Sequence, residues 1–492
     1  MRNRKSANDL PTWDPNLLWY AKAVAKMKTR PITDPTSWRY QAAIHDYTPQ
    51  RDPFRIAGEH LPSSADQARF WRRCQHGSWF FLPWHRAYLL FFERIVASTV
   101  TALGGPAGWT LPYWNYSDPA NAGARTLPLA FQQPKLPDGT PNALFVPSPN
   151  RAPAANSNQT VGTPDDADIS DCLGKSDFVN TGVVQQFGGG PTGFSHGGGV
   201  MGACELGPHG SMHGAVGGPS GWMSAFDTAA LDPIFWLHHA NIDRLWELWR
   251  RQSTSHTDPA QALWRSGVTF FFHDEHGTQV TVKSQQMVDL ADPFLDYEYQ
   301  GMPPKPAPVA RPLIPAGPKL GITMTQRQTI PEMVGATSGS ITLGSEPGTA
   351  HLTIAAPAGP AAGHMIGAIA APERTVHLVL ENVQAPAYPI ETYQVYVNLP
   401  ENANPEEQQD LKAGILPRFG IVEASQSDNE HGGAGVNLSY DITKIVKTLE
   451  SRNAWDPAQL RVAFIPVRTP GDREGDPAIV QVRVGRVSLY LS

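Results

Sequence analysis

Residues 231–244 read Leu231-Asp232-Pro233-Ile234-Phe235-Trp236-Leu237-His238-His239-Ala240-Asn241-Ile242-Asp243-Arg244. Apolar residues recur at helical spacing from here to residue 252, so we predict a helix over Phe235–Gln252. Neighbouring side chains on a helix point about 100° apart, so only one of His238 and His239 can easily bind a given metal ion. We choose His239, because Asp243 follows one turn later and could support its ring.

Two further histidines lie upstream of this stretch, four residues apart in His209-Gly210-Ser211-Met212-His213. On a helix this spacing places both imidazoles on one face, close enough to bind one metal ion. A zinc protease would carry Glu directly after the first histidine, where this chain has Gly210. With His239 as the third donor, the sequence predicts an all-imidazole metal site.

A second group of histidines lies in the Trp-rich N-terminal part. His45 ends an amphipathic run, and His76 and His85 flank the aromatic stretch Gly77–Trp84. By ligand type, two all-imidazole trios suit copper, zinc, iron or nickel. Dinuclear zinc and magnesium hydrolases usually add bridging carboxylates, which are not interleaved here. Two copper ions with three neutral nitrogens each would keep open positions for O2 and could accept two electrons.

The composition is that of a globular protein, with 492 residues, 41% hydrophobic and 17% charged. The net charge of -6 excludes the basic field that nucleic acids or anionic membranes require, and no run approaches a membrane span. No apolar segment follows Arg2, Arg4 and Lys5, so we expect a solvated N-terminal end without a signal peptide. A cytoplasmic location is expected, unless a leader has been removed.

The cysteines and tryptophans complete this picture. Three cysteines cannot form a disulfide framework, although spacing leaves a Cys172–Cys204 pair open. Thirteen of the 14 Trp lie at or before Trp264, and 301–318 holds seven Pro and reads as an extended linker. We therefore predict domains at residues 1–300 and 319–492, joined by a linker at 301–318.

The two domains differ in periodicity, which predicts an α+β multidomain protein. Residues 125–221 read as loop, whereas helices are expected over Trp38–His45, Ala65–His76, Trp84–Ser98 and Phe235–Gln252. After the linker, residues 376–380, 393–397 and 480–484 alternate with period two, which predicts an all-β sandwich or barrel. One short helix, Ile442–Leu449, is expected there with Asp441 as its cap.

These motifs carry a family resemblance. Cys74–Ser78 with Phe81–Leu89 resembles the first copper motif of type-3 copper proteins, and Asp232–Arg244 with the upstream His209 and His213 resembles the second. The family comprises tyrosinases, catechol oxidases and haemocyanins, and the match covers most of residues 30–300. The resemblance implies a four-helix bundle that holds two copper ions, with O2 as co-substrate. One copper would bind to His45, His76 and His85, and the other to His209, His213 and His239.

The resemblance also implies roles for other residues around the metals. Cys74 would form a thioether with His76, Glu205 would hold a water that takes the proton of a phenol, and Phe226 would be the gate residue. Tyr297-Glu298-Tyr299 resembles the paired-tyrosine motif that closes the catalytic domain. Many members that hydroxylate monophenols strongly have Asn at the position of Gly210, so this glycine puts that activity in doubt.

The β-rich domain resembles the C-terminal domain that covers the copper site in latent polyphenol oxidases and molluscan haemocyanins. Leu416 and Phe419 are candidates for its blocking side chain, and activation by acid, detergent or linker cleavage is expected. The predicted function is that of a tyrosinase, acting on small phenols. The alternatives are a catechol oxidase, a haemocyanin-like O2 carrier and a dinuclear zinc hydrolase. Homo-oligomer formation stays open.

Overall fold

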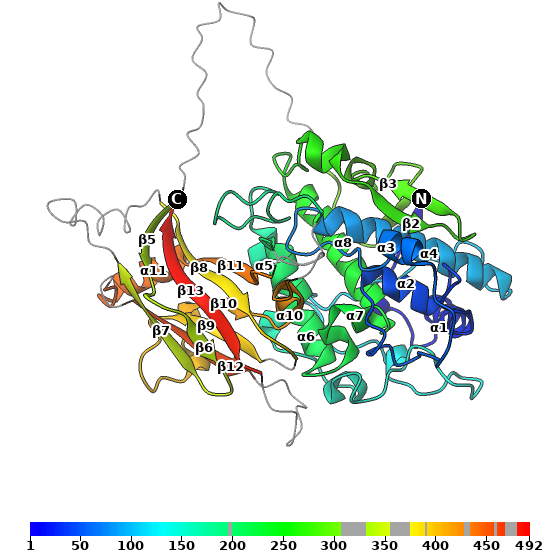
Figure 1. Ribbon diagram of the computed structural model, residues 1–492, viewed down its shortest axis with the longest axis horizontal. Coiled ribbons are helices and arrows are strands. Elements are labelled where there is room, and N and C mark those ends of the chain that lie inside the picture. The colour runs from blue at the N-terminus through cyan, green and yellow to red at the C-terminus, as the bar shows by residue number, and fades with distance from the viewer. Residues whose placement is uncertain are drawn as a thin grey trace, which may run out of the picture.

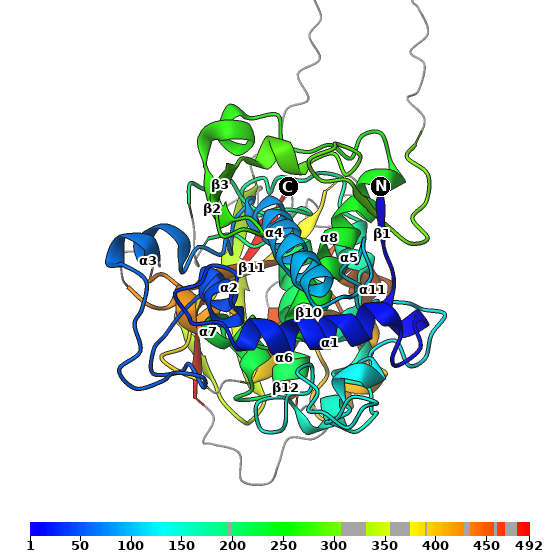
Figure 2. The same cartoon turned by 90° about the vertical axis from the view of Figure 1, so that its right-hand side faces the viewer.

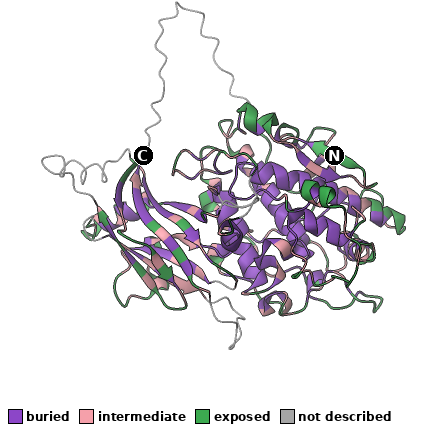
Figure 3. Cartoon of the chain, viewed as in Figure 1, coloured by how far each residue is buried: buried purple, intermediate pink, exposed green. Residues whose placement is uncertain are grey.

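The computed structural model describes residues 1–194, 199–306, 331–354, 374–388, 391–427, 433–456, 460–467 and 480–492. A helical domain and a β-rich domain lie side by side (Figure 1). Each is built around a core of buried side chains, as the burial colours of Figure 3 show. Most of the predicted linker, 301–318, lies outside the described residues.

The bounds of two helices in the first domain agree closely with the prediction, and those of the other helices differ from it. The predicted helices Trp38–His45 and Phe235–Gln252 are confirmed, and the central helix α4 is longer than expected at both ends. The helices are α1 (Pro15–Lys28), α2 (Trp38–His45), α3 (Ser64–Phe70), α4 (Phe81–Ala102), α5 (Ser170–Leu173), α6 (Ser211–Gly217), α7 (Phe226–Ala229) and α8 (Ile234–Gln252).

Helix α1 was not predicted, although its first turn carries a clear signal. The Asp14 side chain accepts a hydrogen bond from the amide of Asn16, and Pro15 occupies the first helical position. Both features favour a helix start, because Asp satisfies an open amide and Pro has none to satisfy. α1 packs against α4, which in turn packs against α8 (Figure 2).

The helix predicted over Ala65–His76 is wrong in its second half, since α3 ends at Phe70. The φ angle of Arg72 is 57°, which a right-handed helix cannot contain. The Arg72 amide instead donates to the carbonyl of Ala43 at the open C-terminal end of α2. The loop that follows therefore brings His76 beside α2.

The charged N-terminus is not wholly solvated, so that expectation is wrong for Arg4. Strand β1 (Arg2–Arg4) pairs in parallel with β4 (Tyr297–Tyr299), which brings the start of the chain to the end of the helical domain. The Arg4 side chain is fully buried and donates to Glu93 and to the hydroxyl of Tyr299. A buried arginine is tolerated here because acidic and phenolic oxygens surround it.

Asp243 is the acidic centre of this buried cluster. Its carboxylate accepts hydrogen bonds of 2.6 Å from Tyr297 and Tyr299 and an ion-paired one of 2.5 Å from Arg86. Burial opposes ionisation, but the Arg86 and Arg4 guanidiniums and the phenol donors hold the pKa of Asp243 below its ordinary value. The paired tyrosines thus close the domain through this carboxylate.

The second domain is all-β apart from short helices, as predicted. Its described strands form one nine-stranded sheet in the order β10-β9-β12-β7-β5-β13-β8-β11, with β6 also paired to β13. The Tyr440 hydroxyl of β11 donates to the Ile415 carbonyl of β10, so the two ends of the sheet meet and a nearly closed barrel results. The strands are β5 (Glu332–Ala336), β6 (Ile341–Leu343), β7 (Gly348–Ile354), β8 (Val376–Gln384), β9 (Thr392–Val397), β10 (Lys412–Leu416), β11 (Val436–Asp441), β12 (Leu460–Val467) and β13 (Val482–Leu491).

Two helices accompany this sheet, α10 (Ile421–Ala424) and α11 (Thr443–Ser451). α11 matches the predicted short helix, and the Asp441 carboxylate accepts from the Thr443 amide at 2.9 Å. A small hairpin of β2 (Phe270–His273) and β3 (Gln279–Val282) belongs to the first domain. No described helix is long and apolar enough to cross a membrane.

Replacing Asp243 by Asn should lower the free energy of unfolding by about 3–5 kcal/mol, because it leaves two buried guanidiniums without their shared carboxylate. Denaturant titration of the metal-free protein measures this. Glu298→Gln, a partly buried position on the same strand β4, is the matched control and should change stability by less than about 0.5 kcal/mol. Equal stability of the two variants would contradict a central role for Asp243.

Candidate metal centre

Six histidines from five helices and one loop converge beneath the second domain. His45 ends α2, His85 lies in the first turns of α4, and His239 lies in α8. His209 and His213 come from a π-helix, η5 (Glu205–Gly210), and from α6, so the loop predicted over 125–221 contains helix at this point. All six are at most 2% exposed.

Ring distances show that the two predicted trios form one continuous cluster. In the first trio the ring centroids lie 5.2–5.8 Å apart, and in the second 4.6–5.5 Å. The trios meet where His85 stacks on His239 at 4.4 Å and His76 lies 5.6 Å from His209. The structure therefore brings all six predicted ligands together.

Backbone carbonyls orient four of these rings. Nδ1 of His45 donates to Phe226, that of His85 to Phe81, that of His209 to Glu205 and that of His213 to Met223, at 2.7–3.1 Å. A proton held on Nδ1 leaves the lone pair on Nε2. Metal-binding histidines commonly show this arrangement, because the hydrogen bond fixes both tautomer and ring direction.

The electrostatics of the cluster suit a cation. Burial, reinforced by neighbouring imidazoles, lowers the pKa of His85 to about 3 and also lowers the pKa of His209, His213 and His239. The rings are therefore neutral near pH 7, as metal ligation requires. Among the described residues, Nε2 of His85 and of His209 has no hydrogen-bond partner. Buried acceptors without donors fit a metal ion.

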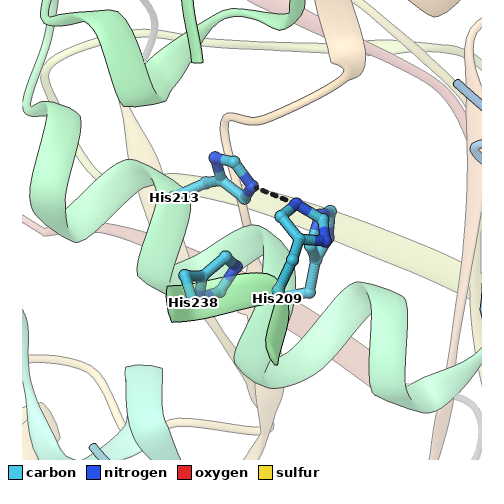
Figure 4. Close-up of side chains that lie close together, drawn as sticks. His209, His213 and His238 are labelled. Carbon is cyan, nitrogen blue, oxygen red and sulfur yellow. Dashed lines mark hydrogen bonds between the residues drawn. The ribbon is translucent and has the colours of Figure 1, made fainter. Parts of the chain in front are cut away.

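The second trio has the spacing of ligands around one ion. Nε2 of His213 lies 3.3 Å from Nε2 of His239, and two nitrogens bound tetrahedrally at about 2.0 Å are about 3.3 Å apart. The donor atoms of His209, His213 and His239 lie within 4.8 Å of one another, and those of His238 join them (Figure 4). The sequence favours His239 over His238 as the ligand, whereas the structure groups both with His209 and His213.

The first trio is less regular. Donor atoms of His45 and His85 group with His239, whereas those of His45 and His76 group with the thiol of Cys74. Cys74 is buried, which raises the pKa of its thiol. Its position beside His76 suits the predicted thioether, which stays a prediction. Cys172 and Cys204 are buried free thiols, so the open pairing is not formed.

The predicted support of His239 by Asp243 is wrong. Asp243 contacts the buried arginines and tyrosines instead, and Nδ1 of His239 has no hydrogen-bond partner among the described residues. One helical turn separates the two residues, but the carboxylate turns toward Arg86 on α4. Its link to the metal centre is therefore through helix packing.

Glu205 lies in the π-helix before His209. Pro208 lies inside this helix and lacks an amide proton, which favours the wider turn. One Glu205 carboxyl oxygen accepts from the Gly77 amide at 2.7 Å, and the other has no partner among the described residues. Burial raises the pKa of Glu205 to about 8, against the pull of the backbone donors. Such a carboxyl group is suited to hold a water.

Two phenyl rings cover the histidine cluster. Phe226 stacks on His76 at 4.1 Å, and its role as a gate residue stays a prediction. Phe419, from the second domain, stacks on His213 at 3.8 Å and lies 4.8 Å from Phe226. Phe419 belongs to the hydrophobic core of the helical domain, whereas Leu416 belongs to that of the β domain. Of the two candidates for the blocking side chain, Phe419 is the one over the site.

A polar contact of Glu423, near Phe419, joins the two domains. The buried Glu423 carboxylate accepts from the amide of Phe226 at 2.9 Å and from the hydroxyl of Tyr388 at 2.5 Å. A cavity of about 400 Å³ next to it is lined by both domains and includes Asp227 and Arg51. Burial raises the pKa of Glu423, and no pattern in the sequence marked it.

Comparison with known proteins agrees with this architecture. Residues 35–252 match the common central domain of tyrosinase, 268–311 the polyphenol oxidase middle domain, and 330–492 a domain of unknown function. The chain is 36% identical to a tyrosinase from Hahella sp. (strain CCB-MM4) over 100% of this chain and 99% of that protein. It is 30% identical to aureusidin synthase from Antirrhinum majus over 63% of this chain and 55% of that protein.

Solved structures show the same fold over the whole chain. Latent apple tyrosinase matches with a TM-score of 0.62 at 21% identity, covering 100% of this chain and 97% of that one. A latent aurone synthase matches with a TM-score of 0.59 at 20% identity, covering 100% and 89%. Helical domain, imidazole cluster and β cover thus define a copper oxidoreductase that acts on phenols with O2. The chain belongs to the tyrosinase and polyphenol oxidase family.

The contact between the domains should depend on pH through Asp227. Burial raises the pKa of this carboxyl to about 6, although Arg51 lies 3.3 Å away. Because this pKa is higher in the folded than in the unfolded state, the protonated carboxyl stabilises the folded protein. The contribution is complete below about pH 4 and is lost as the pH rises toward 6. The Asp227→Asn side chain cannot ionise, so the variant should not lose this stability. Between pH 4 and 6 its melting temperature should therefore rise relative to that of wild type. The corresponding difference in the free energy of unfolding is at most about 3 kcal/mol.

Melting curves at unit pH intervals measure this difference, with Glu298→Gln as the control. A difference between Asp227→Asn and wild type that stays constant across the window would contradict the assignment.

Proposed function

We propose that this protein is a latent dicopper tyrosinase, which uses O2 to hydroxylate monophenols at the ortho position and to oxidise o-diphenols to o-quinones. The observation that carries this proposal is the convergence of six buried imidazoles under a phenyl ring supplied by the second domain. The Hahella relative, which is named a tyrosinase, supports the same activity. The copper ions would supply O2 binding and two-electron oxidation.

The ligands are assigned by trio. His45, His76 and His85 would hold one copper, and His209, His213 and His239 the other. All-imidazole sets suit copper, and the rings fit because they are buried together and Nε2 of His85 and of His209 lacks a hydrogen-bond partner among the described residues. Carboxylate-rich dinuclear hydrolases have a different donor set. The chain's contribution is to fix these rings and to exclude water.

The site also offers a place for the ring of a phenol and a group that can take its proton. The Phe419 ring, stacked on His213, shows that a phenyl group fits between the histidines and Phe226. A phenol in that place would lie flat against the same imidazole. A water held by the free carboxyl oxygen of Glu205 could take its hydroxyl proton. In this proposal Glu205 assists in forming the phenolate, and His213 and Phe226 position the ring.

A catechol oxidase with little hydroxylase activity is the second candidate, and Gly210 favours it. This glycine follows His209 directly, where many strongly hydroxylating relatives carry Asn. A catechol needs no oxygen inserted, so its oxidation does not depend on that side chain. Phe226 over the site also favours small, flat diphenols.

Removing the covering ring should activate the intact protein. We expect Phe419→Ala, loaded with copper, to oxidise catechol at least about tenfold faster than wild type, because it opens the space above His213. Quinone absorbance measures the rate, and metal analysis should give two copper ions per chain. Met333→Ala, at a side chain 47% exposed on the β domain, is the control. Equal rates in all three proteins would show that Phe419 does not block access.

The open variant also separates the two candidate activities. Tyrosinase predicts quinone from a monophenol, while a catechol oxidase gives product only from the diphenol. Adding Gly210→Asn should raise the ratio of monophenol to diphenol rates, since the amide can polarise the water on Glu205. Space allows it, because a β-carbon at residue 210 would have only ordinary contacts, 3.4 Å or longer. An unchanged ratio would remove Gly210 from the explanation.

A further inference from the structure

A second cavity lies between the two domains, and none of the six histidines lines it. It measures about 360 Å³, with walls from α5, η5 and α6 on one side and from β10 and β11 on the other (Figure 1). The two domains contact each other here, because Lys412 of β10 forms an ion pair with Asp165 and Asn437 of β11 pairs with Val200. A cavity of this size can hold a small organic molecule.

Carboxylates dominate the charged part of this cavity. Its acidic side chains are Asp165, Asp168, Asp171 and Asp441, and Lys412 is the only basic side chain among the described residues that line it. Asp165 and Asp171 each pair with a lysine, whereas Asp168 and Asp441 have no ion-pair partner among the described residues. The cavity therefore favours a positively charged ligand.

The hydroxyl group of Ser439 indicates a hydrogen-bonding ligand in the same place. Ser439 lies on β11 between Leu438 and Tyr440, whose side chains belong to the core of the barrel, so its own side chain faces outward to the cavity. The residue is 5% exposed, and its Oγ has no hydrogen-bond partner among the described residues. Burying a hydroxyl without a partner is unfavourable, and a donor inside the cavity would satisfy it.

The walls favour an extended organic cation over a single metal ion. Among the described residues, no three acidic groups of this cavity bring their oxygens close enough together to share one ion. The walls also carry aliphatic surface, to which Leu206 and Ile415 contribute. An aliphatic amine matches both features, because its methylene groups can pack on apolar surface while its ammonium groups donate to carboxylates and to a hydroxyl oxygen.

We propose that this cavity binds an aliphatic diamine or polyamine. One ammonium group would donate to Ser439 and Asp441, which share a face of β11, and another to Asp168 of the helical domain. The inference goes beyond the proposed oxidation of phenols and needs no metal ion. A ligand that both domains contact strengthens their attachment, and so favours the covered arrangement of the histidine cluster.

Spermidine is the probe for this site. The full-length, metal-free protein is titrated with it in a calorimeter at physiological ionic strength, where salt screens binding to scattered surface charges. Wild type should bind one spermidine and should melt at a higher temperature in its presence. Ser439→Ala should bind it about threefold more weakly and Asp441→Asn about tenfold more weakly, since the second loses a charged acceptor. Asparagine can still cap the helix that follows residue 441.

Ser488→Ala is the matched control for Ser439→Ala. The Oγ of Ser488 is also buried without a partner among the described residues, on β13 of the same sheet, but Ser488 does not line the cavity. Without spermidine, neither alanine variant should melt at a lower temperature than wild type. Only Ser439→Ala should lose affinity for spermidine, a difference that a purely structural role would not produce. Glu298→Gln is the control for Asp441→Asn.

Filling the cavity gives an independent variant. Gly207 lines the cavity, and a β-carbon at this residue would meet nothing within 4 Å. Gly207→Leu should therefore place its side chain in the cavity and abolish spermidine binding.

The outcomes that would overturn the proposal are distinct. Wild-type affinity in Gly207→Leu, or in both Ser439→Ala and Asp441→Asn, would show attraction to surface charge only. A wild type that binds no spermidine at millimolar concentration would refute the site outright. Neither result bears on the proposed function, which is tested by the oxidation of catechol.

Discussion

Six buried imidazole rings converge on one space, and the rest of the structure is arranged around them. Nε2 of His85 and of His209 has no hydrogen-bond partner among the described residues, which is unfavourable without a cation beside these nitrogens. The backbone carbonyls that accept from Nδ1 prevent the rings from turning away. Three of them are close in sequence to their histidine, whereas the Phe226 carbonyl that accepts from His45 lies 181 residues away, so α2 and α7 must be placed correctly together.

An aromatic stack and a buried ion pair hold these helices together. Phe92 of α4 stacks on Trp236 of α8 at 3.4 Å. On the same two helices, Arg86 and Asp243 form a buried ion pair, closed by the tyrosines of β4. Stacking sets the distance between the helices, and the ion pair sets their register.

Local patterns in the sequence correctly predicted those helices and strands that depend on neighbouring residues. The i, i+4 spacing of His209 and His213 and the apolar stripe of α8 are such patterns, as is the period-two alternation of the strands. Several failures involve long-range contacts, although α1 was missed despite the local signal of Asp14 and Pro15. Nothing near Arg4 indicates that it ends beside Glu93 and Asp243, and the positive φ of Arg72 becomes favourable only when α2 offers its open carbonyls.

The site residues also divide into those that sequence motifs identify and those that depend on how the two domains pack. Motif resemblance supplied the six imidazoles, Glu205 and Phe226, but it could offer only two candidates for the covering side chain. Choosing Phe419 required knowing how the β domain sits. Glu423 and the position of His238 were beyond the sequence, because a carboxylate that receives the amide of Phe226 leaves no trace in spacing or composition.

The stacking of Phe419 on His213 has a consequence for inhibition. A phenyl group held by its own chain acts as a tethered competitor, whose effective concentration is set by the rigid attachment of the two domains and not by dilution. For short tethers that concentration reaches the millimolar range or above. Free aromatic molecules at micromolar levels would therefore rarely displace it, and loosening the attachment is a far more efficient way to switch the enzyme on than raising the supply of its phenols.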